Sequence, residues 1–371
     1  MKISEFQLER YLALHEFSAP FLLCTSDSET MTIRELLSLK PGADEEFHNL
    51  GLGYTESQGN PALRKEIANL YTSLNSDQIV VSAGAEEAIF LLMNILLSPG
   101  DHVIVQAPAY QSLYEVANAI GCAVSRWELK ENGSGWVSDI EELKRLIRPD
   151  TKAIVVNSPH NPTGHLFTHG EWNDLNKIIR ETSIRLISDE VYRGLEHARE
   201  LQLSAAADEH PRNISIGVMS KAFGLAGLRI GWIATHDKEV VRRFLAMKDY
   251  TTICSSAPSE FLATLALQNK DVILRKNLAI VHQNLHLLSD FFKKFSHVMT
   301  WSAPIAGSTA FPRIINGMSA QKFCDEVREN IGVLLLPGSV FGVDGSYVRF
   351  GYGRSDMHQS LNKLVQYLQE K

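Results

Sequence analysis

From residue 79 to residue 234, short runs of β-branched and other apolar residues alternate with segments of helical pattern. This alternation is typical of a parallel sheet whose connecting helices cross over its faces. We therefore expect a doubly wound, mainly parallel α/β domain. Its strands are expected at residues 79–82, 103–106, 123–127, 153–157, 185–189, 215–219 and 229–234.

The rest of the chain has a different pattern. Helices are expected at residues 86–97 and 171–180, the second opened by a capping box of Thr168 and Glu171. Beyond residue 250 come longer helices at 260–268 and 271–295, then short strands and two more helices. We expect three parts: an N-terminal helix and arm (1–50) packed on the small domain, a large domain (51–255) and a smaller α+β domain (256–371).

Composition narrows the function classes. The 371 residues include 36 basic and 43 acidic side chains, a net charge of −7, which argues against a nucleic-acid partner bound through its phosphates. The four cysteines show neither the spacing of a metal site nor that of a disulfide framework. No apolar signal core or membrane span is present, so we expect a cytoplasmic protein without membrane or metal.

The segment SKAFGLAGLRIGW, from Ser220 to Trp232, places one lysine and one arginine between two apolar strands. Charged side chains between buried strands are energetically costly unless they are paired with a partner. Lys221 in a cleft beside another cation could form a Schiff base with an aldehyde cofactor, and Arg229 could bind a phosphate. The alternative is a solvated loop with two unrelated cations.

Two further segments follow the carboxyl ends of expected strands, where open α/β sheets bind ligands. Asp189 ends one strand and Tyr192 follows it, although an isolated carboxylate there is also a common helix cap. Beside a pyridine ring, this carboxylate would keep the ring nitrogen protonated. Asn161 lies in the turn NSPHNPTG, which is either a plain turn or a rigid support that aims the amide at a ligand.

Two other positions have a binding and a structural interpretation. A strand passes through Gly84 into a helix, so the free N–H groups of the first turn, at Ala85 and Glu86, suit a phosphate. Arg349 is the one cation in the apolar segment YVRFG. It could grip a carboxylate with both of its terminal nitrogens, or it could protect an edge strand from aggregation.

Together these segments resemble the fold-type I pyridoxal-phosphate enzymes, specifically the class I and II aminotransferase family, over nearly the whole chain. The lysine segment and the order of the asparagine, aspartate, lysine and arginine carry the resemblance. It implies pyridoxal 5'-phosphate as cofactor, and Lys221 as the catalytic residue that holds it as an internal aldimine and shuttles the Cα proton.

The resemblance also implies roles for the other candidate residues. Asp189 would pair with the pyridine nitrogen, Asn161 and Tyr192 would bind the phenolic oxygen, and Arg349, with Asn161, would bind the substrate. Tyr110 would stack on the ring, although a tyrosine at a helix start is ordinarily core packing. The phosphate would contact Ser220, Arg229 and the backbone of Ala85 and Glu86, and Tyr54 would reach the phosphate of a neighbouring subunit, which implies a homodimer with shared sites.

Two positions depart from the family pattern. Val218 stands where a small polar residue usually supports the phosphate, and the arm at residues 23–30, LCTSDSET, replaces a glycine–proline motif. The arm resembles that of capreomycidine-synthase-like enzymes. The expected function is transfer of an amino group between an L-amino acid and a 2-keto acid. The alternatives are a lyase or cyclase on the same scaffold, and a sensor that binds without turnover.

Overall fold

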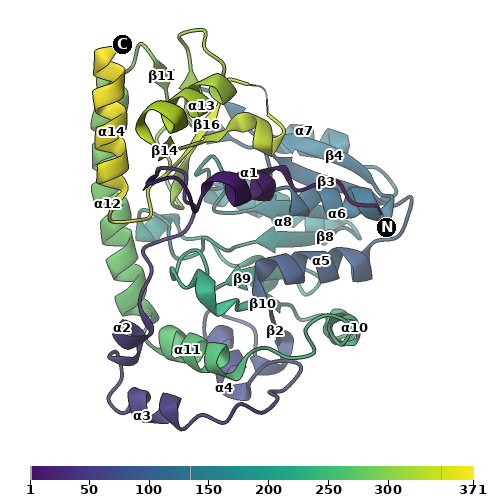
Figure 1. The fold of residues 1–371 in the computed structure, drawn as a ribbon. Helices are drawn as coiled ribbons and strands as arrows, with labels where there is room; N and C mark the ends of the chain where they lie inside the picture. The colour runs from purple at the N-terminus through teal and green to yellow at the C-terminus, as the bar shows by residue number, and fades with distance from the viewer. Residues whose placement is uncertain (1, 134, 344) are drawn as a thin grey trace.

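A seven-stranded sheet forms the centre of the computed structural model, which describes residues 2–133, 135–343 and 345–371 (Figure 1). The strands lie in the order β2-β10-β9-β8-β7-β3-β4. All neighbours from β9 to β4 are parallel, whereas β10 is antiparallel to both β9 and β2. The strands are β2 (Ile79–Ser82), β3 (His102–Ala107), β4 (Ala123–Glu128), β7 (Thr151–Asn157), β8 (Arg185–Asp189), β9 (Ile214–Val218) and β10 (Gly231–Ala234).

Each expected strand is present, and one begins later than the sequence predicts. The strand expected at residues 229–234 starts at Gly231. Arg229 cannot belong to it because its backbone is left-handed, with φ 53° and ψ 42°. The strand's start is therefore set by a turn that the apolar pattern did not reveal.

Helices cover both faces of the sheet, as the alternation of side chains along the strands requires. In β7, Val155 packs with the helices of one face, whereas Ile154 and Val156 pack with those of the other. The first face carries α5 (Gly84–Leu96), α6 (Ser112–Ile120) and α10 (Lys238–Lys248), and the second carries α7 (Ile140–Leu146) and α8 (His169–Glu181). The capping box of Thr168 and Glu171 is confirmed at the start of α8.

The N-terminal segment contacts both the C-terminal part and the α11 side of the molecule. Helix α1 (Gln7–His15) packs on the short helix η4 (Gly338–Phe341), and β1 (Phe21–Leu22) pairs in parallel with β14 (Val333–Leu334). The next helices, α2 (Ile33–Leu37), α3 (Ala43–His48) and α4 (Pro61–Ala68), lie beside α11 (Ala257–Gln268) in Figure 1.

The C-terminal part begins with the long helix α12 (Lys270–Lys294), which lies beside the last helix α14 (Met357–Glu370) (Figure 1). Between them, α13 (Ala320–Ile331) covers short strands. Of these strands α13 contacts β14 and β15 (Leu336–Pro337); the others are β11 (Met299–Thr300), β12 (Thr309–Ala310), β13 (Arg313–Ile314) and β16 (Val348–Gly351). Strand β16 pairs with both β12 and β15.

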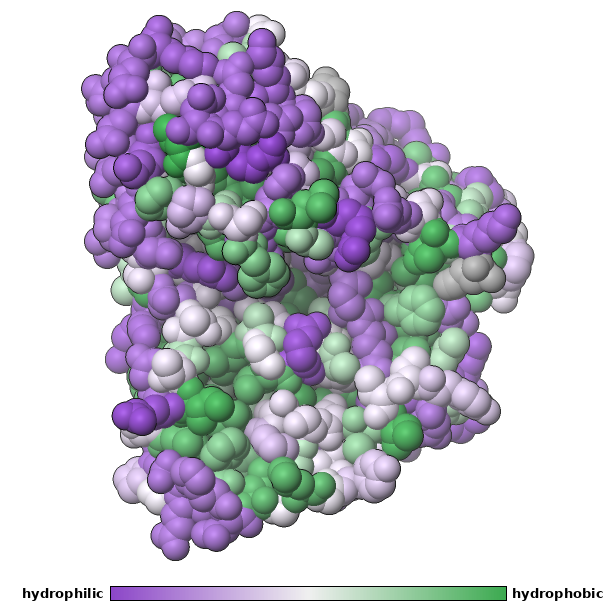
Figure 2. Space-filling model, in the orientation of Figure 1, coloured by the Kyte–Doolittle hydropathy of each residue, from purple (hydrophilic) through white to green (hydrophobic). Residues whose placement is uncertain are grey.

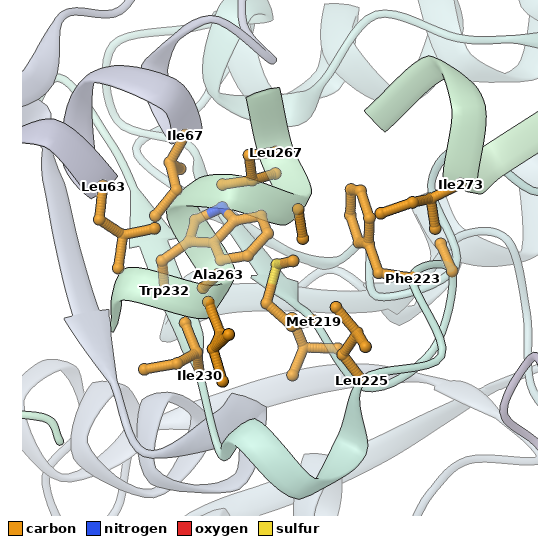
Figure 3. Packing of buried hydrophobic residues seen from close by; sticks show 14 of the residues in the cluster. Leu63, Ile67, Met219, Phe223, Leu225, Ile230, Trp232, Ala263, Leu267 and Ile273 are labelled. Atoms are coloured by element: carbon orange, nitrogen blue, oxygen red, sulfur yellow. The ribbon is translucent and has the colours of Figure 1, made fainter. Parts of the chain in front are cut away.

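A buried cluster holds the loop between β9 and β10, the loop that carries Lys221 (Figure 3). Met219 and Phe223, on either side of the lysine, are 0% and 4% exposed and point into this cluster, where they meet residues of α4, α11 and α12. Because apolar side chains anchor the loop on both sides of Lys221, its backbone has little freedom to move. This cluster joins segments on both sides of the expected domain boundary at residues 255 and 256, which remains a prediction.

Over the described residues, none of the helices has both the length and the apolar character that crossing a membrane demands.

Candidate functional site

A cavity of about 560 Å³ lies where β7, β8 and β9 end. Asn157, Asp189 and Val218, the last residues of these strands, all line it. The surface is hollowed near the centre of the molecule, below α1 (Figure 2). Of the residues expected in a site, the cavity gathers Ala85, Glu86, Tyr110, Asn161, Asp189, Tyr192, Ser220, Lys221 and Arg229. Tyr54 and Arg349 are not among its lining residues.

The deep wall of the cavity combines a carboxylate and a hydroxyl that are shielded from water. Asp189 is 5% exposed, and its Oδ1 accepts a hydrogen bond of 3.1 Å from the Val191 backbone. Burial raises the pKa of Asp189 to about 7. Tyr192 is 2% exposed, and its hydroxyl has no partner within the described part of the chain. A buried polar atom without a partner is costly, so this wall suits a polar ligand.

Lys221 faces the N-terminal arm. Its Nζ donates a hydrogen bond of 3.0 Å to Ser26 Oγ, and its backbone oxygen accepts one of 3.2 Å from Ser28 N–H. Ser26 Oγ thus occupies the position next to the amine, in the segment where the sequence departs from the family pattern. The arm is itself fixed, because Asp27 forms a bidentate ion pair with Arg354, at 2.9 Å and 2.7 Å.

At one end of the cavity, the first turn of α5 approaches the start of β10 closely. A Cβ added to Gly231 would lie 2.5 Å from the Gly84 carbonyl carbon, and one added to Gly84 would lie 2.6 Å from Arg229 Nη2. Glycine at both positions therefore brings the free N–H groups of the helix beside a guanidinium. Ser220 lines the same cavity. A helix N-terminus, an arginine and a hydroxyl together form an anion site.

Arg349 lies behind Asn161. Its Nη1 donates a hydrogen bond of 3.2 Å to Asn161 Oδ1, and its Nη2 donates one of 2.6 Å to the Cys24 carbonyl oxygen. Its Nε has no acceptor among the described residues. The side chain is 2% exposed. The Asn161 N–H in turn donates 2.7 Å to Asn157 Oδ1, which fixes the turn. The guanidinium also lies over the Phe341 ring, 5.4 Å from its centroid, and it forms no ion pair with a carboxylate of the described residues, so it suits an anionic ligand.

Residues of α1 and of the segment before it complete the cavity, and sequence reasoning missed them. Tyr110 Oη donates a hydrogen bond of 2.5 Å to Glu9 Oε1. The centroids of the Tyr110 and Phe6 rings lie 4.9 Å apart. Glu86 Oε1 accepts 3.2 Å from Ser112 Oγ. Burial raises the pKa of Glu86, and raises that of Tyr110 further above its ordinary value. No local pattern around Phe6 or Glu9 distinguishes them from ordinary residues of a surface helix.

Tyr54 lies outside this cavity. It is 92% exposed and lines a separate surface hollow together with Leu52, Cys254 and Pro258. The structure of a single chain therefore does not bring Tyr54 to the other candidate residues.

Comparison with known proteins identifies a family and relatives of this chain. The profile of the family described as "Aminotransferase class I and II" matches residues 23–367. Capreomycidine synthase from Streptomyces vinaceus is 28% identical over 97% of this chain and 93% of its own length.

Two solved structures cover the whole chain. A PLP-dependent aminotransferase from Streptococcus suis is 33% identical, with a TM-score of 0.93 over 100% of this chain and 99% of that one. A PLP-dependent cyclase, OrfR, is 28% identical, with a TM-score of 0.90 over 100% of this chain and 98% of that one.

Proposed function

Because the chain belongs to the aminotransferase class I and II family, we propose that it transfers an amino group from an L-amino acid to a 2-keto acid. The family implies pyridoxal phosphate as its cofactor, which supplies an electron sink for a carbanion at the substrate Cα. The observation that carries the proposal is the gathering of Lys221, Asp189 and Tyr192 around one cavity.

The buried wall fits the ring of the cofactor. Asp189 would accept a hydrogen bond from the protonated pyridine nitrogen, which would stabilise the ionised carboxylate that burial disfavours. The unpartnered Tyr192 hydroxyl and the Asn161 amide would donate to the phenolic oxygen. The orphaned hydroxyl and the disfavoured carboxylate are therefore both satisfied by the same group.

The anion site at the first turn of α5 fits the phosphate of the cofactor. Backbone N–H groups of Ala85 and Glu86, the Ser220 hydroxyl and the Arg229 guanidinium would hold it. Val218 lines the cavity without offering a hydroxyl, so the grip depends on the remaining groups.

Lys221 is the proposed acid–base residue. Its Nζ would take the proton that leaves the substrate Cα and return it to the carbon of the cofactor, which a flexible amine on a fixed backbone can reach. In the structure this amine donates a hydrogen bond of 3.0 Å to Ser26 Oγ. Arg349 would bind the substrate α-carboxylate and so orient Cα toward Lys221.

The test is the visible absorption spectrum of the cofactor-loaded protein, recorded before and after adding single amino acids without a keto acid. Conversion of the cofactor to its amine form identifies a transaminase and its donor. If no amino acid in a broad panel produces the amine form although the cofactor is bound, the proposal of transamination is wrong.

A second candidate is a lyase or cyclase on the same scaffold. It is favoured by the likeness to capreomycidine synthase over 97% of the chain and to the cyclase OrfR at a TM-score of 0.90. The residues named above prepare a carbanion without determining its fate. Mass spectrometry of the products separates the candidates, because elimination or cyclisation changes the amino acid while the cofactor keeps its aldehyde form.

A homodimer with shared sites completes the proposal. Leu52, Tyr54, Tyr250 and Ile253 are each at least half exposed, and apolar surface gathers over α11 and its neighbouring loops in Figure 2. Tyr54 would then reach the phosphate in the partner's cavity. Light scattering that finds only monomers at micromolar concentration would contradict this arrangement.

A further inference from the structure

The Glu87 carboxylate joins two parts of the molecule that lie far apart in the sequence. Its Oε2 accepts a hydrogen bond of 2.6 Å from the Ala83 N–H, just before α5. Its Oε1 accepts hydrogen bonds from the hydroxyl groups of Thr251 and Thr252, at 2.5 Å and 2.8 Å. Hydrogen bonds to an ionised carboxylate are stronger than those between neutral groups. One side chain therefore ties the start of α5 to the loop at residues 249–256, which connects α10 to α11.

On the α5 side, the Glu87 carboxylate lies next to the anion site. It binds the Ala83 N–H, whereas the N–H groups of Ala85 and Glu86, in the first turn of α5, are those proposed to hold the cofactor phosphate. A side chain that binds a backbone N–H at a helix start restrains the backbone there. Glu87 thus helps to fix the direction in which the two phosphate-binding groups point.

The loop at residues 249–256 has a backbone conformation that its contacts must maintain. Ile253 has φ 61°, a left-handed conformation that is costly for a β-branched residue. Lys248, which is 0% exposed, donates a hydrogen bond of 2.9 Å from its Nζ to the Ile253 carbonyl oxygen. Strained residues persist only where the surrounding structure fixes them. Loss of a contact therefore favours a relaxed loop, and a ligand can bias the balance between the held and the relaxed loop.

The same loop supports the segment that carries Tyr54. Lys248 Nζ donates a second hydrogen bond, of 3.0 Å, to the Ser57 carbonyl oxygen. Thr55 Oγ1 donates one of 3.0 Å to the Ser255 carbonyl oxygen. This segment and the loop both contribute residues to the exposed face proposed for the dimer. A continuous series of contacts thus runs from the anion site of one subunit to the face that would meet the other.

We propose that Glu87 is a positioning residue that couples the phosphate site to the dimer face, so that an anion in the site tightens the dimer. This inference rests on the proposed function, because it takes the start of α5 as the site of the cofactor phosphate. An anion that orders the first turn of α5 favours the loop conformation that Glu87 holds, and this conformation presents the Tyr54 segment to the partner. By thermodynamic linkage, the dimer must then bind the anion more tightly than the monomer does.

The exchange of subunits between two preparations, one labelled with a donor dye and one with an acceptor dye, measures how firmly the dimer holds. Its rate is recorded without ligand, with pyridoxal 5'-phosphate, and with inorganic phosphate as a probe of the anion site alone. We expect pyridoxal 5'-phosphate to slow the exchange of the wild type about tenfold, because coupling of this size acts mainly on the dissociation rate. A bound cofactor that leaves the exchange rate unchanged would overturn the proposal.

Two variants break the connection at its two ends. Glu87→Gln keeps the size of the side chain, but an amide cannot accept hydrogen bonds through both of its terminal atoms, as this carboxylate does. The double variant Thr251→Val, Thr252→Val removes the two hydroxyl groups and leaves the residues of the anion site in place. We expect the ligand to slow exchange less in both variants than in the wild type. Slowing as large as that of the wild type in either variant would overturn the proposal.

Glu171→Gln is the matched control. Glu171 accepts hydrogen bonds from the Thr168 N–H and the Thr168 hydroxyl at the start of α8, so it makes the same kinds of contact on the other face of the sheet. Its exchange should respond to the ligand as the wild type does. If the absorption spectrum shows that pyridoxal 5'-phosphate does not bind, the proposed function is wrong, and the arm with inorganic phosphate then decides the coupling by itself. The two failures are therefore distinguishable.

Discussion

Arg349 Nη1 donates its hydrogen bond to Asn161 Oδ1, at 3.2 Å, so one residue of the small C-terminal sheet orients an amide in the turn that follows β7 of the large sheet. Because the oxygen of that amide is engaged, its NH₂ group is left to donate into the cavity that Asn161 lines. The proposed contacts to the substrate carboxylate and to the cofactor are therefore coupled through one side chain.

Replacing Arg349 should weaken the binding of amino acids. Arg349→Ala removes the two terminal nitrogens proposed to grip the α-carboxylate, and we expect the dissociation constant to rise about a hundredfold. Calorimetry with several amino acids measures the effect. Arg313→Ala, an exposed arginine on the neighbouring strand β13, is the control. Unchanged affinity in Arg349→Ala would place the carboxylate site elsewhere.

Lys221→Ala should abolish turnover and the absorption band of the cofactor bound through the lysine, because the variant has no amine to form that bond or to carry the proton. The fold should persist, since Met219 and Phe223 still anchor the loop. Absorption spectra and circular dichroism measure both effects. Lys152→Ala, an exposed lysine on β7, should behave as the wild type. Turnover at the native rate in Lys221→Ala would refute the assignment.

The contribution of Asp189 to the stability of the cofactor-free protein should fall as the pH rises from about 4 to about 7. Burial raises its pKa from 3.8 to about 7, so the folded state binds a proton that the unfolded state has already released. That contribution is fully present below pH 4 and is lost as the pH rises through 7.

Asp189→Asn isolates this effect because asparagine stays neutral. Melting temperatures of the cofactor-free wild type and variant are compared at pH 5 and pH 8. We expect the melting temperature of the variant, relative to that of the wild type, to be higher at pH 8 than at pH 5. A difference that does not change with pH would show that Asp189 keeps an ordinary pKa.

Two glycines of the lysine loop should respond differently to alanine. Gly224 has φ +68°, and an added Cβ would lie 2.1 Å from the Glu29 carbonyl oxygen, whereas a Cβ on Gly227 would meet nothing within 4 Å. Gly224→Ala should therefore cost at least about 1 kcal/mol from the left-handed backbone alone, with more from the clash. Gly227→Ala should be tolerated. Denaturant unfolding of both variants measures the difference, and equal stabilities would contradict it.

The doubly wound fold could be predicted because each buried strand repeats a strong local pattern, and the likeness to fold-type I structures confirms it. Most of the candidate site residues could be predicted because they lie at or just after the ends of strands. Asp189 ends β8 and Asn157 ends β7, just before the turn that holds Asn161, and parallel strands bring such residues to one edge of the sheet.

The contribution of the N-terminal segment could not be predicted. Phe6, Glu9 and Ser26 lie in the cavity or beside Lys221 only because distant parts of the chain pack together, and nothing in their neighbours in the sequence marks them. The left-handed turn at Arg229 could not be predicted from the sequence for a similar reason. Arg229 adopts this conformation against the local preference of an arginine, with its guanidinium beside Gly84 of α5.

The arm at residues 23–29 also determines when the site can form during synthesis. Leu23 receives a hydrogen bond from Gly351 N–H, the Cys24 carbonyl from Arg349, and Asp27 from Arg354. At least 325 residues separate each donor from its acceptor, so these contacts of the arm can form only after that length of chain has been synthesised. Contacts between such distant residues form late and slow the folding of a chain. Folding of the large sheet can thus precede the cavity, and a chain truncated before β16 would have the lysine and the arm but not the donors that hold the arm in place.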